Sequence, residues 1–392
     1  MFSRAITLRG GAAIRSLGSG LASVLFAVAS GCGATVSSDG YDPHLKYAQR
    51  GDPLVLAAPA DQPMSAPDPI ARDEYLLELP KRGGKILIPS DLPAAAREQV
   101  KQSLDALFGT PAAPAMPAGI AAVGGLSLDA DVLAKGSASY RVRCSSCHGM
   151  TGDGRGAGAG FPYPRDFRNG QFKRTTGSAA NGKPRVEDLH RAIRGGVPGT
   201  SMPLFDLLPD DDVNALAAYV IHLTIRGEVE AALIAGSHPD AEEGIVDVGA
   251  AARRVANRSH RKWLEAQPPS VSFVQSVLEG EGQAESIRRG YAVFVANACL
   301  SCHEGYGRKA SYRYDIWGLP NRAQDLTQPE YRWGREPADL ARILRHGIKP
   351  ANMPAAILKD VELADLVEFL RALPYPARFP PEVGASVQGG SR

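Results

Sequence analysis

The chain has 392 residues, a hydrophobic fraction of 44% and a formal net charge of only +2. This length is sufficient for two or three domains, each with a core of its own. A near-neutral charge argues against a nucleic-acid-binding protein, because such proteins carry a strongly basic face. We therefore expect no nucleic-acid partner.

The first 31 residues have the pattern of an export signal. Three arginines precede the apolar run "LASVLFAVAS", and small residues follow it. The run is too short to span a bilayer, and no later segment is apolar and long enough to do so. The sequence "ASGCGA" resembles the lipobox of bacterial lipoproteins, which implies acylation of Cys32 and attachment to a membrane surface on the periplasmic side. The alternative is a plain secretory signal that is cleaved nearby.

The next hundred residues combine two kinds of sequence. Residues 32–69 are rich in Pro, Ala, Asp and Gly, which predicts a flexible tether. Residues 70–131 predict a small α/β element that is followed by a linker, "TPAAPAMPAGIAAVGG". In this element, "EYLLELPKRGGKILIPS" favours two short strands around a Lys-Arg-Gly-Gly turn. The stretch "SDLPAAAREQVKQSLDALFG" favours a helix with one apolar face, made of Val100, Leu104, Leu107 and Phe108.

The rest of the chain contains a duplication. "DLHRAIRGGVPGTSMP" at 188–203 aligns without gaps on "DLARILRHGIKPANMP" at 339–354. Each copy is preceded by a CxxCH sequence and followed by a helical pattern with acidic residues at its start. The order in both copies is helix, CxxCH, long loop, helix, methionine loop, helix. A duplicated helical domain accounts for this order, and the period is too long for a solenoid.

Four of the five cysteines stand in the two CxxCH sequences, "CSSCH" and "CLSCH". A structural zinc site needs four ligands, and each sequence offers at most three. A redox dithiol does not need a histidine directly after its second cysteine. Covalent haem attachment uses every residue of the motif, because two thiols bind the porphyrin and the adjacent histidine binds the iron. The thioether residues are then Cys144, Cys147, Cys299 and Cys302.

Each repeat resembles a class I cytochrome c domain, in the combination of "CSSCH" with "GTSMP" and of "CLSCH" with "PANMP". The resemblance implies a mainly α protein with two covalently bound haem c groups. It implies His148 and Met202 as axial ligands of the first iron, and His303 and Met353 as those of the second. The expected domains are cytochrome c domains at 132–226 and 285–377, a helical connector at 227–284 and a disordered tail at 378–392.

The resemblance also suggests residues around each haem. A proline carbonyl is expected to orient the proximal histidine, from Pro162 or Pro164 in the first domain and from Pro320 in the second. Arg165 and Arg322 follow these prolines and are candidates for contact with haem propionates, with a surface salt bridge as the alternative. The remaining candidate histidines occupy unequal positions in the two repeats, which argues against ligation by His190, His222 and His346.

Two His/Met haems in one chain favour electron carriage at a membrane surface by a protein that is not an enzyme. The expected donor is a quinol-oxidising complex or a dehydrogenase, and the expected acceptor is a terminal oxidase or reductase. The alternative is a dihaem redox enzyme, such as a peroxidase or a sulfur-compound oxidoreductase, with an exchangeable ligand at one haem. A third interpretation is a structural subunit whose haems serve only folding.

Overall fold

The fold is described from a computed structural model, which covers residues 42, 44–57, 72–177, 181–241, 244–267, 283–315 and 317–389. The predicted export signal, including Cys32, lies outside the described residues, as do parts of the predicted tether and connector. All described residues belong to one compact unit, Ser37–Arg392. Within them, none of the helices has the length and apolar character that crossing a membrane requires.

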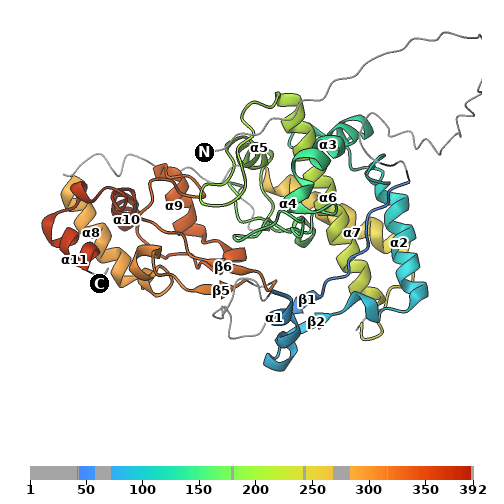
Figure 1. Cartoon of the computed structure of the whole chain (residues 1–392), viewed down its shortest axis with the longest axis horizontal. Coiled ribbons are helices and arrows are strands. Elements are labelled where there is room, and N and C mark those ends of the chain that lie inside the picture. The colour runs from blue at the N-terminus through green and yellow to red at the C-terminus, as the bar shows by residue number, and fades with distance from the viewer. Residues whose placement is uncertain are drawn as a thin grey trace, which may run out of the picture. The chain divides into compact units, whose positions relative to one another are not determined.

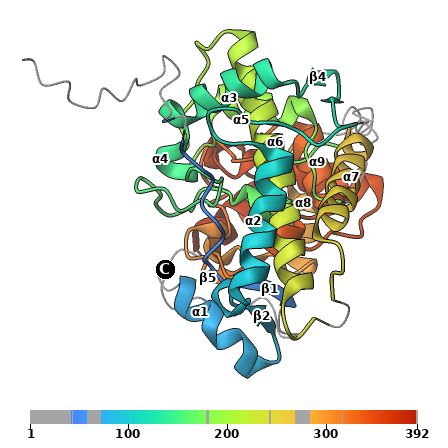
Figure 2. The ribbon, with the colours of Figure 1, turned by 90° about the vertical axis from the view of Figure 1, so that its right-hand side faces the viewer.

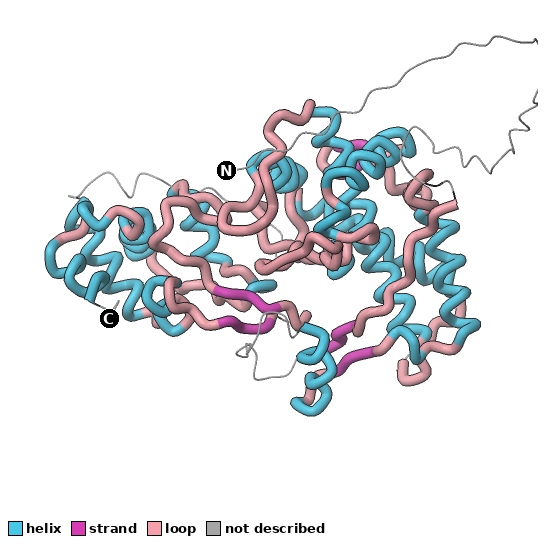
Figure 3. The backbone as a smooth tube through the Cα atoms, in the orientation of Figure 1, coloured by secondary structure: helices cyan, strands magenta, loops and turns pink. Residues whose placement is uncertain are grey.

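The protein is mainly helical, and its described strands form three short antiparallel pairs (Figure 3). The first repeat contains helices α3 (Ala130–Arg143), α4 (Ser145–His148), α5 (Val186–Gly195) and α6 (Asp210–Ser237). Asp129 caps α3, since its carboxylate accepts a hydrogen bond from the Val132 amide at 2.9 Å. Three aspartates in the first turn of α6 complement the positive end of its dipole.

The second repeat contains α8 (Gln283–Ala296), α9 (Pro337–His346) and α10 (Asp360–Ala372). Between α8 and α9 lies a hairpin of β5 (Tyr312–Tyr314) and β6 (Pro320–Arg322), in which Tyr314 pairs with Pro320. The chain ends in α11 (Pro381–Gly389). The predicted disordered tail is wrong for this segment, because Val383 and Val387 are buried in the core of the second repeat.

In both repeats the first and last helices cross at a glycine (Figure 1). A Cβ atom on Gly136 would lie 2.1 Å from the carbonyl oxygen of Ala215, and one on Gly290 would lie 2.0 Å from that of Asp365. Aromatic rings pack beside each crossing, at centroid distances of 5.2 Å for Tyr140–Tyr219 and 5.4 Å for Phe294–Phe369. The equivalent crossings bring each CxxCH sequence to the same end of its helix pair.

The segment before the first repeat comprises β1 (Leu54–Ala57), α1 (Arg72–Glu78), β2 (Lys85–Leu87), α2 (Ala94–Phe108), β3 (Ala122–Val123) and β4 (Leu126–Ser127). The predicted pair of strands around the Lys-Arg-Gly-Gly turn is wrong. Tyr75, Leu76 and Leu79 bury one helical face before the turn, so that part is helical. The strand after the turn, β2, pairs with β1 instead.

The predicted tether differs from the structure over residues 44–57. Tyr47 is buried against α6, where its hydroxyl lies 2.9 Å from that of Tyr219. The backbone amide of Arg50 donates to Glu230, also in α6, at 2.9 Å. The composition of this segment predicted a flexible chain. It could not reveal the partners that order the segment, because they lie about 170 residues away in the sequence.

Helix α6 continues past the predicted domain boundary at residue 226. It is buried on nearly all sides, because α2, α3 and α7 (Val248–Ala266) pack around it. Figure 2 shows α2, α6 and α7 side by side. Tyr47, α2, β3, β4 and the described part of the connector therefore share one core with the first repeat.

Candidate haem sites

The first CxxCH sequence lies at the end of α3 and continues through α4. His148 directs its Nδ1 atom toward the carbonyl oxygen of Arg165 at 3.3 Å, which leaves Nε2 for another partner. Its ring stacks on Phe167 at a centroid distance of 4.7 Å. Burial lowers the pKa of His148 to about 4, so the imidazole is neutral near pH 7, as a metal ligand must be.

The second CxxCH sequence has the same arrangement. His303 directs Nδ1 toward the carbonyl oxygen of Gln324 at 3.2 Å, and burial lowers the pKa of its imidazole. Each histidine thus makes the hydrogen bond that orients a metal-binding imidazole, and each makes it to a backbone oxygen of the long loop after its motif.

The residues that supply these oxygens differ from the prediction. In the first repeat the carbonyl of Pro164 lies against Gly154, where an added Cβ would be 2.6 Å from its oxygen. The next carbonyl, that of Arg165, meets His148, because successive carbonyls of an extended chain point to opposite sides. In the second repeat Pro320 is part of the β5–β6 hairpin, so the oriented carbonyl comes four residues later.

None of the four motif cysteines takes part in a disulfide, and each is partly buried. Burial raises the pKa of Cys144 to about 12, and it also raises the pKa of Cys299. All four line one cavity together with both proximal histidines. Two thiols beside one imidazole in each repeat are the residues that attach a haem covalently and bind its iron.

The two methionine loops follow α5 and α9 in the same conformation. Gly196 and Gly347 begin them with φ angles of +60° and +65°, which favour glycine. The amide of Val197 then donates to the carbonyl of Met202 at 3.2 Å, and the amide of Ile348 to that of Met353 at 2.9 Å. These turns bring both methionines to the wall of the cavity that the cysteines and histidines line.

This cavity has a volume of about 860 Å³ and is formed by both repeats. Its lining is mostly aromatic and aliphatic, which suits a large flat macrocycle. Because both cysteine pairs, both histidines and both methionines line it, the residues present fit a haem group in each repeat. His190 and His222 do not line this cavity, and neither does His346.

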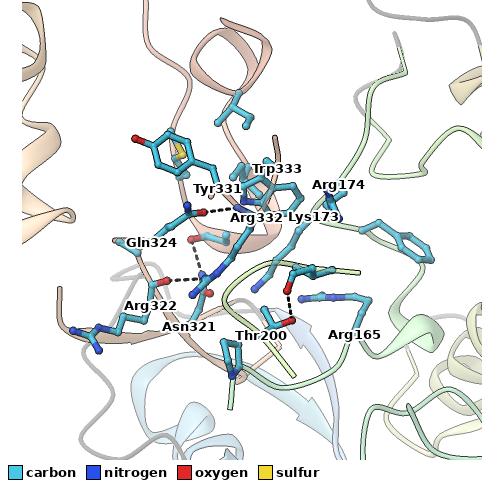
Figure 4. A pocket seen from close by; sticks show the side chains of 18 of the residues that line it. Arg165, Lys173, Arg174, Thr200, Asn321, Arg322, Gln324, Tyr331, Arg332 and Trp333 are labelled. Atoms are coloured by element: carbon cyan, nitrogen blue, oxygen red, sulfur yellow. Dashed lines mark hydrogen bonds between the residues drawn. The ribbon is translucent and has the colours of Figure 1, made fainter. Parts of the chain in front are cut away.

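Basic side chains from both repeats also line the cavity (Figure 4). Arg165 and Arg322 are among them, as the sequence suggested. Sequence comparison missed Lys173, Arg174 and Arg332, which lie in the long loops. These loops have no common alignment in the two repeats, so the repeat pattern contained no signal for them.

The cytochrome c family model matches two segments of the chain, residues 133–224 and 287–374. A search of curated protein sequences gives no match. A solved structure, a reducing HAO-like protein complex of Kuenenia stuttgartiensis, is similar at 23% identity and a TM-score of 0.44. The match covers 61% of this chain and 95% of that one.

The prediction that the chain is not an enzyme is not retained. A likeness of this strength assigns no particular reaction to the chain. The family match is independent of it and agrees with the site geometry in each repeat. Because each matched segment contains one CxxCH sequence and one methionine loop, the chain contains two cytochrome c domains.

Proposed function

We propose that the protein transfers electrons through two haem c groups, one in each cytochrome c domain. Cys144 and Cys147 attach the first and Cys299 and Cys302 the second. The observation that carries this proposal is that both sets of binding residues line a single cavity. Haems held by these residues would share one cavity, which would favour electron exchange between the domains.

The axial ligands of this proposal are His148 with Met202, and His303 with Met353. A haem ligated by an imidazole and a thioether supplies one-electron chemistry with a raised reduction potential. Burial keeps each imidazole neutral, and the Nδ1 hydrogen bond orients it. The turn in each methionine loop holds the sulfur-bearing residue at the cavity wall.

The proposal extends to location and partners. The export signal and the lipobox-like sequence at Cys32 support a protein that is lipid-anchored on the periplasmic side of a bacterial membrane. A redox protein in that location exchanges electrons with a quinol-oxidising complex or a dehydrogenase on one side. On the other side it exchanges them with a terminal oxidase or reductase.

Haem content and carbon monoxide binding test the proposal on the exported, haem-loaded protein. We expect two haems per chain, and no change of the Soret band when carbon monoxide is added to the reduced protein. A rapid change in about half of the Soret intensity means that one iron has an exchangeable ligand. That outcome would contradict the ligand assignment at one haem. The protein should then be assayed for turnover, first with peroxide as the substrate.

Matched variants assign the sites. Met202→Ala should open the first haem to carbon monoxide and leave the second closed, and Met353→Ala should do the reverse. Met150→Ala serves as the control, because this methionine has no counterpart in the second repeat and does not line the cavity. If neither Met202→Ala nor Met353→Ala increases binding, the two methionines are not the ligands.

A further inference from the structure

The long loops of both domains bring basic side chains to one part of the shared cavity. Arg165, Lys173 and Arg174 come from the first domain, and Arg322 and Arg332 from the second (Figure 4). Lys173 of the first domain and Arg332 of the second lie near each other in this cavity. The cluster therefore forms only where the domains meet.

The charges of this cluster have little compensation. In the described part of the chain, Lys173 has no ion pair or hydrogen-bond partner for its ammonium group. Arg165 Nη1 and Arg332 Nε are buried without a hydrogen bond. The Oδ2 atom of Asp315 is 3.9 Å from Arg165 Nη2.

The acidic residue that lines the cavity itself is Asp188. Its carboxylate already accepts hydrogen bonds from the amide and hydroxyl of Thr176, both at 2.7 Å, and from the amide of Arg185 at 3.0 Å. The carboxylate of Asp188 therefore makes its hydrogen bonds within the first domain. The single negative charges of Asp188 and Asp315 are fewer than the five positive charges of the cluster.

Several cations that share a cavity wall with little compensation are costly, because burial removes hydration that no counter-ion replaces. Burial and the nearby charge of Arg165 lower the pKa of Lys173 to about 7. Arg332 adds to this effect, and Asp315 opposes it. A bound anion would remove the cost, and a carboxylate is the anion that guanidinium groups bind with good geometry.

We propose that Lys173 and Arg332 form a single carboxylate site shared by the two domains, which binds propionate groups from both haems and raises both reduction potentials together. This inference rests on the proposed function, because it requires a haem in each domain. Each haem carries two propionates, so the ligand class is already present in the loaded protein. The site would also explain why the cations gather at the domain contact instead of around each haem separately.

Potentiometric titration of the loaded protein tests the shared site. Lys173→Met and Arg332→Met each remove one positive charge, which stabilises the oxidised irons and lowers their potentials. We expect each single substitution to lower both potentials. The expected size is about tenfold in the reduction equilibrium constant, which is about 59 mV for a one-electron couple. Lys173→Arg and Arg332→Lys keep the charge and should restore both potentials.

Lys135→Met is the matched control. Lys135 lies on α3, pairs with Asp212 at 2.8 Å and does not line the cavity, so it tests the effect of net charge alone. A shift of one potential only, in Lys173→Met or in Arg332→Met, refutes a shared site. A shift of equal size in the control refutes any specific role of the cluster.

The source of the carboxylate is tested by titrating the wild type in phosphate and in chloride buffers. Equal potentials in the two buffers support propionates as the occupants. A potential that changes with phosphate in the wild type, but not in the variants, means that a free anion occupies the site and overturns the assignment. Haem content and carbon monoxide binding are separate readouts, so a failure of the proposed function is distinguished from a failure of this inference.

Discussion

Arg191 of the first domain and Asp339 of the second form a two-pronged ion pair, with N–O distances of 3.0 and 2.7 Å. The two residues stand at different positions of the repeat. Arg191 corresponds to Arg342, and Asp339 corresponds to Asp188. Asp188 is occupied within its own domain, whereas the equivalent Asp339 accepts from the other domain. The two equivalent carboxylates therefore have different roles. Asp188 stabilises a loop of the first domain, and Asp339 contributes to the contact between the domains.

Arg191→Met should weaken the contact between the domains. Asp339 keeps its bond to Arg342 at 3.1 Å in this variant, so no carboxylate is left unpaired. Because Arg191 is half exposed, we expect a loss of about 1 kcal/mol in the free energy of unfolding. Small-angle scattering should show a larger radius of gyration. Arg345→Met, which breaks a pair within the second domain, should change only stability. Equal scattering profiles for all three proteins would contradict the prediction.

The N-terminal segment should stabilise the first haem loop through Asp52. Its carboxylate binds Arg168 at 2.8 and 3.0 Å, and Arg168 in turn binds Asp166, next to the carbonyl that meets His148. Burial acts to raise the pKa of Asp52, but the charges of Arg168 and Arg50 outweigh it and lower the pKa to about 2.

The folded-state pKa is below the unfolded value, so the carboxylate adds stability above about pH 4 and loses this effect as the pH falls toward 2. Asp52→Asn should therefore cost about 2 kcal/mol at pH 7 and progressively less between pH 4 and pH 2. Urea unfolding at several pH values measures this, with Asp240→Asn at an exposed position as the control. A difference that stays constant down to pH 2 would count against the prediction.

The helix crossings should not tolerate a methyl group. Gly136→Ala and Gly290→Ala place a Cβ within 2.1 Å of a backbone oxygen on the facing helix, so the helices must separate. We expect a loss of about 1–3 kcal/mol in each case. Gly195→Ala is the control, since no atom lies within 4 Å of its added Cβ. Thermal unfolding of the three variants measures the difference, and a control as unstable as the crossing variants would falsify the explanation.

Asn352 should hold the second methionine loop in place. It adopts φ +56°, and its side-chain amide donates to the carbonyl of Tyr314 at 3.1 Å. Asn352→Ala loses the hydrogen bond and strains the backbone by about 1 kcal/mol. Asn352→Gly loses only the bond. On the proposed ligation by Met353, carbon monoxide should bind the reduced second haem faster in the alanine variant than in the glycine variant. Identical binding rates in the two variants would show that the backbone strain at residue 352 does not affect ligand exchange at the second haem.

Much of the candidate site was predictable because the residues that attach a haem are close together in the sequence, at a fixed spacing. Cys144, Cys147 and His148 lie within one helical turn, and the same spacing recurs at Cys299. The methionines were identifiable because both repeats place them at one position of an ungapped alignment. The helix crossings show the same repetition, since Gly136 and Gly290 each stand four residues before an aromatic residue, Tyr140 and Phe294.

Other features depended on partners that are remote in the sequence. The carbonyl that meets each histidine is set by the direction of one peptide in a long loop, so Arg165 and Gln324 supply it instead of the predicted prolines. Tyr47 belongs to a segment of flexible composition, yet α6 buries it. Lys173 and Arg332 meet only where two domains pack. Local patterns determine covalent chemistry and helices, whereas carbonyl direction, burial and the sum of charges depend on which distant segments come into contact.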